Sequence, residues 1–433
     1  MNRLSLALAA TAFCGLLSAT ARAASLTDAV LQGTPTLDLR LRCESVEQGN
    51  FVKDAYATTL RGALGYTTKP WQGFDARAEL EGVIAANSDL YNSTGNGIGN
   101  RPVVADPETL GFNQAWLRYT LPSTLPNKIS LTAGRQRLVF DNARFIGTVG
   151  WRQDEQTYDG ALLVAPLGKD FMAQLAHIGN VNSFRRYGPN LVAACAVSGP
   201  CSPDLSLSGQ ALNLAYSSSP KLKLVGYSYW LDFGTNTSAR RDTRTIGLRA
   251  TGRWPLTQGK HGIGLDYTLE AAEQVRYADS PASVDAQYRL AELGLSQGAS
   301  SGSWSGKLGY EVLGGDGSYG FQTPLASLHA FQGWADLFLA TPAMGIRDAY
   351  VQAGGTLEKI ALQASYHDYR ADSQSFDYGA EINLQATRPV VQLRGKPLTL
   401  GLKAAFYEAE GFPVAAGKPY DTTKLWAWLQ YKL

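Results

Sequence analysis

Near its N-terminus the chain reads Thr36-Leu37-Asp38-Leu39-Arg40-Leu41-Arg42, in which polar and apolar residues alternate one by one. Successive side chains of a β-strand point to opposite faces of the sheet, so this stretch would place its leucines on one face and its charges on the other. The same period of two residues returns in Ile263–Glu270 and in Leu398–Ala404. The alternation therefore predicts long strands with one apolar and one polar face.

The pattern repeats along the chain and predicts eighteen strands, each about ten residues or longer. Short turns such as Lys69–Gly73 and Pro166–Lys169 alternate with long connections. If the first strand starts on the periplasmic side of the membrane, every long connection lies on the extracellular side. The even strand count then places both termini on the periplasmic side. This layout is typical of an outer-membrane barrel, with short periplasmic turns and longer extracellular loops. The long connections are 87–108, 139–156, 183–206 and 315–343.

Residues 1–23 have the features of a secretory signal peptide. Arg3 supplies the positive start, Leu4–Leu17 is almost uninterruptedly apolar, and Ala21-Arg22-Ala23 matches the small-x-small cleavage pattern. We therefore expect residues 24–433 to form a single exported domain. Its predicted fold class is all-β, a transmembrane antiparallel β-barrel.

The composition excludes several other classes. The net charge is +2, and it falls to zero when Arg3 and Arg22 leave with the signal peptide, so general attraction to nucleic acid is excluded. No apolar run of roughly 18 residues is present, which excludes a membrane-spanning helix. A soluble sandwich would show the same alternation, with its charges facing bulk water. Long strands behind an export signal favour the barrel, which must close because hydrocarbon cannot satisfy a sheet edge.

Two segments carry a family signature. One is Gly134–Gly147 followed by Trp151–Gly160, and the other is His329–Pro342 followed by Gly345–Tyr350. Both resemble the alginate-export family of bacterial outer-membrane porins. The resemblance implies a monomeric eighteen-stranded barrel that passes a solute, which in the named member is an anionic polyuronate.

Charge bears on which solute such a channel would pass. The predicted lumen carries both signs, and the mature chain has no net charge, whereas a dedicated polyanion exporter would need a positive excess. We therefore expect diffusion of small hydrophilic solutes, anionic or sugar-like, with export of an alginate-like anionic polysaccharide as the alternative.

The Gly134–Gly160 block is predicted to leave the fifth strand, fold inward as a constricting loop and return as the sixth strand. Arginine suits a carboxylate-bearing solute because its planar fork stays charged and can bind at two points. Alternatively, these arginines pair with neighbouring acids and hold the loop in place. The predicted pore-lining residues are Arg135, Arg137, Arg144, Arg152, Asp154, Asp159, Arg40, Arg42, Arg77, Arg118 and Arg347.

The cysteines and histidines suggest no cofactor and no metal site. Cys195 and Cys201 share a polar Gly/Pro-containing stretch and are predicted to form a disulfide in a loop, although two free thiols would also fit. Cys43 should face lipid near a strand end. His367 and its neighbour Asp368 would point to opposite faces of a regular strand, so the sequence predicts no enzyme.

The expected partners follow from the barrel. Outer-membrane lipid should surround it, and a small-molecule or polysaccharide solute should cross it. The last strand, Leu425–Leu433, resembles the terminal signal read by the barrel assembly machinery, although that signal usually ends in Phe.

Overall fold

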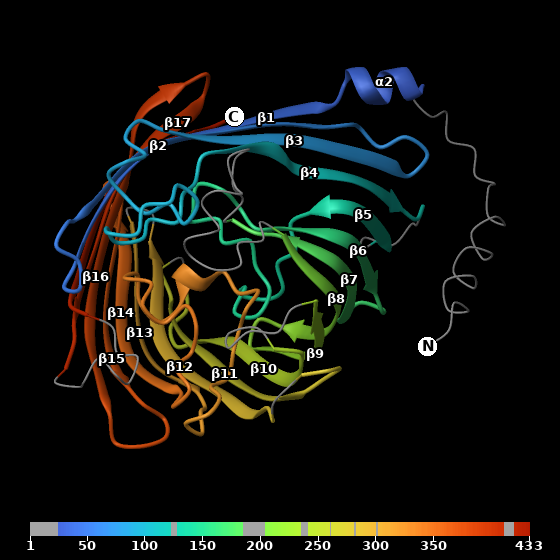
Figure 1. Cartoon of the computed structure of the whole chain (residues 1–433). Helices are drawn as coiled ribbons and strands as arrows, with labels where there is room; N and C mark the ends of the chain where they lie inside the picture. The colour runs from blue at the N-terminus through green and yellow to red at the C-terminus, as the bar shows by residue number, and fades with distance from the viewer. Residues whose placement is uncertain are drawn as a thin grey trace.

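The computed structural model describes residues 25–122, 128–184, 204–234, 241–259, 261–280, 283–299, 302–410 and 420–433. The signal peptide predicted at 1–23 and the disulfide predicted between Cys195 and Cys201 lie outside these ranges. The described residues form one sheet of eighteen antiparallel strands, which confirms the predicted fold class and strand number (Figure 1).

The sheet closes on itself because β1 (Thr34–Gln48) pairs with both β2 (Ala55–Thr67) and β18 (Thr422–Lys432). Every other strand pairs with its two neighbours in sequence, so no strand edge is left open. The remaining strands are β3 (Phe74–Ala85), β4 (Thr109–Thr120), β5 (Ser130–Gln136), β6 (Thr157–Pro166), β7 (Phe171–Asn182), β8 (Asp204–Ser219), β9 (Leu222–Phe233), β10 (Thr243–Pro255), β11 (Ile263–Arg276), β12 (Asp285–Ala299), β13 (Gly302–Leu313), β14 (Ile346–Leu357), β15 (Ile360–Arg370), β16 (Asp377–Leu393) and β17 (Lys396–Glu408).

The connections at the two ends of the barrel differ in length. At one end β14 and β15 are joined by Glu358 and Lys359, and β16 and β17 by Arg394 and Gly395. All four residues have positive φ, as a two-residue type I′ hairpin requires. Strand β1 begins and strand β18 ends at this turn end of the barrel, where Leu433 N donates a hydrogen bond to Leu37 O. The long connections lie at the opposite, loop end, which in outer-membrane barrels is extracellular.

A short helix precedes the barrel and was not expected from the sequence. Helix α2 (Leu26–Leu31) begins with a capping box, in which Ser25 and Asp28 each satisfy the other's backbone N–H. Its Ala29 carbonyl accepts a hydrogen bond from Lys69 N in the β2–β3 turn. A 3₁₀ helix, η1 (Leu328–Ala330), lies within a long loop. Among the described residues, no helix has the length and apolar character needed to cross a membrane.

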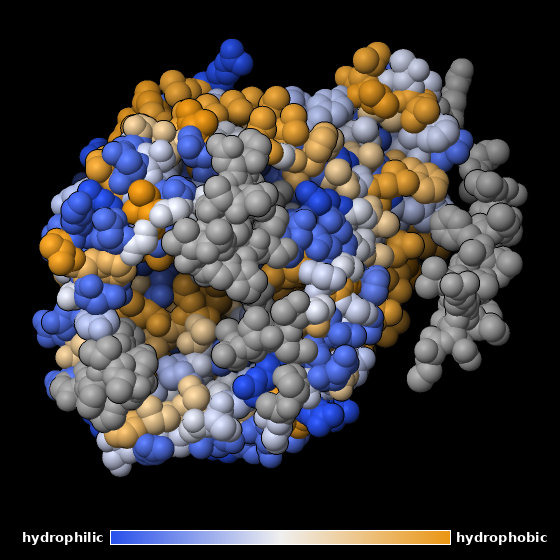
Figure 2. Space-filling view, viewed as in Figure 1, coloured by the Kyte–Doolittle hydropathy of each residue, from blue (hydrophilic) through white to orange (hydrophobic). Residues whose placement is uncertain are grey.

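The outer face of the wall is apolar and the inner face is polar. On β17 the side chain of Leu402 is 54% exposed while its neighbour Lys403 is 7% exposed. Leu362, Leu384 and Leu425 on nearby strands are exposed in the same way. Hydrophobic residues accordingly line the outer wall along the top edge of Figure 2. A closed barrel with this outer face belongs in the outer membrane, with lipid around it.

Two long loops enter the barrel and form its packed core (Figure 1). We call residues 137–156 the first inward loop and residues 314–345 the second inward loop. Gly147 N of the first donates to Leu325 O of the second at 2.9 Å. The ring of Phe145 lies 5.4 Å from Tyr288 on β12 and 6.0 Å from Phe321 on the second loop. The core therefore lies inside the wall, between the loops and the strands.

Replacing Leu402 by Arg tests the orientation of the wall. A charge on the lipid face near mid-strand should cost about 2–4 kcal/mol of folding free energy in a bilayer. Thr399→Arg, on the inner face of the same strand, is the control and should cost much less. Equilibrium folding into phospholipid vesicles measures both, and equal costs would contradict the assignment of faces.

Candidate functional site

The candidate site is the constriction that the two inward loops make, and Arg144 joins its parts. The Arg144 side chain is buried, and its Nε lies 2.6 Å from Glu311 Oε1 on β13. Its Nη1 donates to Thr323 Oγ1 at 2.9 Å and its Nη2 to Gln332 Oε1 at 3.2 Å, both in the second inward loop. One guanidinium therefore holds both loops to the wall.

A second group of charges lies nearer the loop end, and we call it the rim network. Asp336 of the second inward loop accepts a hydrogen bond from Arg152 of the first loop and lies 3.5 Å from Lys424 Nζ on β18. Arg152 Nη1 lies 3.3 Å from Glu44 on β1. Burial opposes ionisation of Asp336, but His329, Lys424 and Arg152 outweigh burial and hold its pKa well below the usual range. The network contains Arg42, Glu44, Asp106, Arg152, His329, Asp336, Lys403 and Lys424.

His329 links this network to a cage of tryptophans. Its Nδ1 lies 2.8 Å from Asp336 Oδ1 and its Nε2 lies 2.7 Å from Lys403 Nζ. Burial lowers the pKa of His329 to about 3, so the ring is neutral near pH 7. The neutral ring donates from Nδ1 to Asp336 and accepts from Lys403 at Nε2. The Lys403 ammonium also lies 3.6 Å from the ring centre of Trp334 and 4.1 Å from that of Trp151, close enough for cation–π attraction.

Four of the predicted arginines hold the first inward loop in place. Arg144 and Arg152 make the contacts described above, and Arg40 on β1 donates to Gln153 Oε1 at 2.7 Å and to Gly150 O at 3.2 Å. Arg42 pairs with Asp106 and donates to Trp151 O. Because all four side chains are buried and engaged by protein groups, the structure supports the alternative in which they position the loop.

The remaining lumen residues in the predicted set lie on β3, on β4 and in the first inward loop. Arg77 and Arg137 both contact Glu79 on β3, and Arg137 also pairs with Glu155. Arg118 on β4 pairs with Asp75, their Nη2 and Oδ2 atoms lying 2.6 Å apart. Asp154 is buried in the first inward loop.

Three predicted pore residues lie on the outer face of the wall. Arg135 pairs in register with Asp159 on β6, and their Nε and Oδ1 atoms lie 2.8 Å apart. Strand β5 continues to Gln136, so the alternation that turns Leu131 outward also turns Arg135 outward, and the loop begins later than the sequence suggested. Arg347 directly precedes the inward-facing Asp348 on β14, so its side chain points outward. There it contacts Asp372 near the loop end.

Some residues of the site were not expected from the sequence. Asp106 belongs to the long connection 87–108, yet its side chain is fully buried against Arg42. Lys424 could have been found from the alternation of β18, because it is one residue out of phase with the lipid-facing Leu425. No local pattern in the sequence predicts the burial of Asp106, because its partner Arg42 is far away in the chain.

Ser365, His367 and Asp348 form a hydrogen-bonded row on the inner face of β14 and β15. His367 Nδ1 lies 2.9 Å from Asp348 Oδ1, and His367 Nε2 lies 3.2 Å from Ser365 Oγ. The order matches a hydrolase triad in which the acid is Asp348, while Asp368, as the sequence analysis argued, cannot share a site with its neighbour His367. Ser365 is 7% exposed and its Oγ also accepts a hydrogen bond from Asn383, so the row links β14, β15 and β16 across the inner face of the wall.

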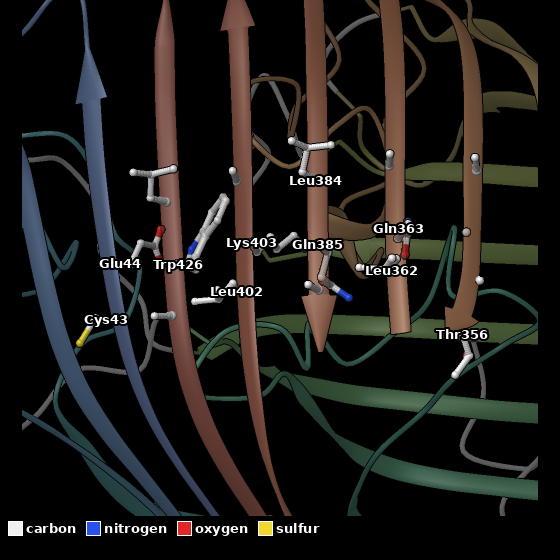
Figure 3. Close-up of a pocket in the computed structure, with 18 of the residues that line it drawn as sticks. Cys43, Glu44, Thr356, Leu362, Gln363, Leu384, Gln385, Leu402, Lys403 and Trp426 are labelled. Atoms are coloured by element: carbon white, nitrogen blue, oxygen red, sulfur yellow. The ribbon is translucent and has the colours of Figure 1, made fainter. Parts of the chain in front are cut away.

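A broad hollow lies on the wall over β13 to β18, β1 and β2, but it belongs to the lipid face (Figure 3). Its lining includes the outward side chains of Cys43, Leu362, Leu384 and Leu402. These side chains are exposed, whereas their inward neighbours such as Glu44 and Trp426 are buried. Cys43 thus lies on the outer face, as the sequence predicted.

Below the constriction the lumen is lined by charges that remain accessible to water. Arg118 is 42% exposed, Arg253 on β10 is 41% exposed and Lys307 on β13 is 36% exposed. Each pairs with an inward carboxylate of the neighbouring strand, and these are Asp75, Asp266 and Glu292. The barrel therefore has a polar, solvated half at the turn end and a packed half at the loop end.

Closed barrels with this architecture define the class of outer-membrane β-barrel proteins, and solved structures of that class match the fold. The chain superposes on OccAB4 of Acinetobacter baumannii with a TM-score of 0.66 at 13% identity, covering 93% of this chain and 99% of that one. OpdL of Pseudomonas aeruginosa gives 0.63 at 15% identity, with the same coverage. OccAB1 of A. baumannii gives 0.65 at 11% identity, covering 96% and 99%.

The match to a known sequence family covers a smaller part of the chain than the structural matches do. Residues 38–176 match the family described as alginate export, which confirms over that part of the chain the resemblance seen in the sequence. The matched region runs from β1 into β7 and includes the whole first inward loop. No curated protein sequence matches the chain.

Replacing Arg144 by Ala should release the inward loops. The change leaves Glu311 buried without its partner, which typically costs about 3–5 kcal/mol. We expect a lower unfolding temperature and larger, noisier single-channel currents. Arg118→Ala is the matched control, because removing an exposed pair costs about 1 kcal/mol or less. Equal effects of the two variants would contradict the anchoring role of Arg144.

Acid should weaken the docking of the second inward loop. A released His329 would take up a proton near pH 6.5, whereas the docked ring resists protonation until about pH 3. Docking therefore loses stability as pH falls below about 6.5, by roughly 2 kcal/mol or less at pH 5. Asp336 stays ionised over this range, because its pKa is held well below the usual value.

Single-channel recordings at pH 7.5 and pH 5 test this expectation. Opening events should become more frequent at pH 5 in the parent protein. His329→Gln keeps a hydrogen-bonding side chain but cannot titrate, so its recordings should not respond to pH. Parent recordings that are identical at the two pH values would overturn the proposed dependence.

Proposed function

We propose that the protein is an outer-membrane channel through which small hydrophilic solutes, anionic or sugar-like, diffuse. The observation that carries the proposal is the solvated charge lining of the turn half, where Arg118, Arg253 and Lys307 remain accessible to water. A barrel of this strand number is wide enough to enclose an aqueous channel. A protein that served only as a structural anchor would have no use for solvated charges inside its wall.

The two inward loops limit the size of the solute. They pack against each other and against the aromatic residues of β9 and β12, and so narrow the loop half of the lumen. Small solutes pass such a constriction more readily than polymers, since width and lining charge together set selectivity. Paired charges of both signs fit solutes with several polar groups, such as organic acids and sugars.

Export of an alginate-like polysaccharide is the second candidate. The match of residues 38–176 to the alginate-export family favours it. A polyanion would have to thread the constriction, where the buried arginines are already engaged by carboxylates and backbone carbonyls. Export would therefore need the inward loops to move.

Conductance in planar bilayers tests the proposal. The purified protein should conduct ions, and uronates, organic acids and neutral sugars should be compared as blockers of the current. Membranes that stay closed would sink the channel assignment. Stronger block by long uronate oligomers than by monomers, on a chain-length series, would favour the export candidate.

The solvated arginines should influence ion preference. Arg118→Ala and Arg253→Ala leave Asp75 and Asp266 as unpaired lumen anions, so the reversal potential in a salt gradient should shift toward cation preference. Arg135→Ala serves as the control, because its side chain lies on the outer face and should leave the reversal potential unchanged. If a variant that carries both Arg118→Ala and Arg253→Ala kept the reversal potential of the parent protein, ions would not pass these residues.

A further inference from the structure

The connections at the turn end of the barrel are rich in basic residues. Among the described residues, the acids in these connections are Asp170 and Glu358. Each of six connections contains an exposed lysine or arginine, so this end carries a surplus of positive charge. We call these residues the turn cations, and they are Lys69, Lys128, Lys169, Lys221, Lys359 and Arg394.

The surplus is local to the turn end. The whole chain has a net charge of only +2. Exposed acids are frequent in the connections at the loop end, and examples are Asp89, Asp279, Asp316 and Asp421. The positive charge of the turns is therefore not the mark of a generally basic protein, and it calls for a partner at this end.

The turn cations have little to hold them within the protein. Among the described residues, Lys128, Lys169 and Lys359 form no ion pair. Lys69 Nζ donates to an uncharged group, Gln32 Oε1, at 3.0 Å. The lumen cation Lys307, by contrast, contacts the carboxylate of Glu292. Because no carboxylate neutralises them, the turn cations keep their full attraction for an anion outside the chain.

Aromatic side chains follow the same end on the outer face of the wall, and we call them the aromatic belt. Phe74 lies against Tyr119 across β3 and β4, with ring centres 4.6 Å apart. Phe171 and Tyr216 pair in the same way across β7 and β8, at 4.8 Å. Trp254 on β10 is exposed on this face. Aromatic girdles mark the interface between hydrocarbon and headgroups, so the turn cations just beyond the belt lie at the depth of the lipid phosphates.

Lys221 joins the two features. Its Nζ lies 4.9 Å from the ring centre of Trp254, and its carbonyl oxygen accepts a hydrogen bond from Tyr267 Oη at 2.9 Å. The ammonium is thus held at the edge of the belt, where it can bind a phosphate while acyl chains lie against the wall. Neighbouring turns are two strands apart, about 10 Å. Lys169 and Lys221 can therefore contact adjacent headgroups of one leaflet.

Helix α2 adds an apolar surface at this end of the barrel (Figure 1). Its Leu26, Val30 and Leu31 side chains are exposed. The helix is fixed to the wall because Tyr66 Oη donates to Val30 O and Lys69 N donates to Ala29 O. Exposed leucine and valine side chains beside cations are typical of segments that lie in a membrane interface.

We propose that the turn end is a binding surface for anionic phospholipid of the inner leaflet. The turn cations contact the headgroup phosphates, and the aromatic belt and α2 contact the acyl chains below them. Each lysine near an anionic membrane surface strengthens binding about fivefold. The inference concerns the lipids around the barrel, so it does not depend on which solute crosses the lumen.

Counting the lipids that stay bound to the purified full chain tests the inference without using conductance. The protein in detergent is mixed with equal amounts of phosphatidylglycerol and phosphatidylcholine that have the same acyl chains, and native mass spectrometry counts the bound molecules of each. We expect phosphatidylglycerol to be favoured about tenfold or more at low salt. Because salt screens exposed charges, about 0.5 M NaCl should reduce this preference.

Variants locate the binding surface. Lys169→Gln combined with Lys221→Gln should lower the preference about fivefold or more, whereas Lys169→Arg combined with Lys221→Arg should keep it. The matched control is Lys53→Gln combined with Arg276→Gln, which removes two exposed charges from the loop end. This control should change the preference less than about twofold. Heat-modified mobility on gels confirms that each variant is folded.

Three outcomes would overturn the inference. Equal losses in the turn-end and loop-end Gln variants would show that net charge, and not the turn end, sets the preference. A preference that survives high salt would assign it to the packing of acyl chains. A parent protein that holds both lipids equally would refute the lipid partner and point to an acidic periplasmic protein as the partner of the basic turns.

Discussion

Every other feature of this protein depends on the pairing of β1 with β18. Residues Asp38–Gln48 pair in register with Thr422–Lys432, so the first and last strands complete the ring. In hydrocarbon, an unpaired edge would leave a row of N–H and C=O groups without partners, at several kcal/mol each. Closure removes that cost and at the same time creates an interior separated from lipid. The inward side chains can then be charged, because lipid never reaches them.

The interior is divided into two zones that meet different physical requirements. In the loop half, Arg144, Arg152 and Asp336 are buried, and burial is tolerable only because each has an oppositely charged partner in contact. Their geometry fixes the positions of both inward loops. In the turn half, Arg118 and Arg253 pair with acids but stay accessible to water. A packed constriction above a solvated lumen is the arrangement expected of a selective diffusion path.

The arginines therefore have roles that their residue type alone could not reveal. Arginine suits both the anchoring of a loop and the binding of a solute, because its planar guanidinium donates hydrogen bonds in several directions and stays charged. Arg144 and Arg118 differ only in what surrounds them. Lys403 gives a further example, because its ammonium lies among tryptophan rings and beside His329. Lys424 also joins the rim network through Asp336, and the arginine-centred interpretation overlooked it.

Alternation along the strands was enough to predict the barrel, its eighteen strands, the inner and outer faces and the two ends, because side-chain direction in a strand is a local property. It also placed Cys43 on the outer face and the first inward loop within the lumen. Local pattern could not decide where β5 ends, so Arg135 and Asp159 were expected in the pore although they face outward. Nor could it decide which distant charges meet, such as Arg42 with Asp106 or Arg152 with Asp336. Those contacts join segments far apart in the chain, and only the closed barrel and the folded loops bring them together.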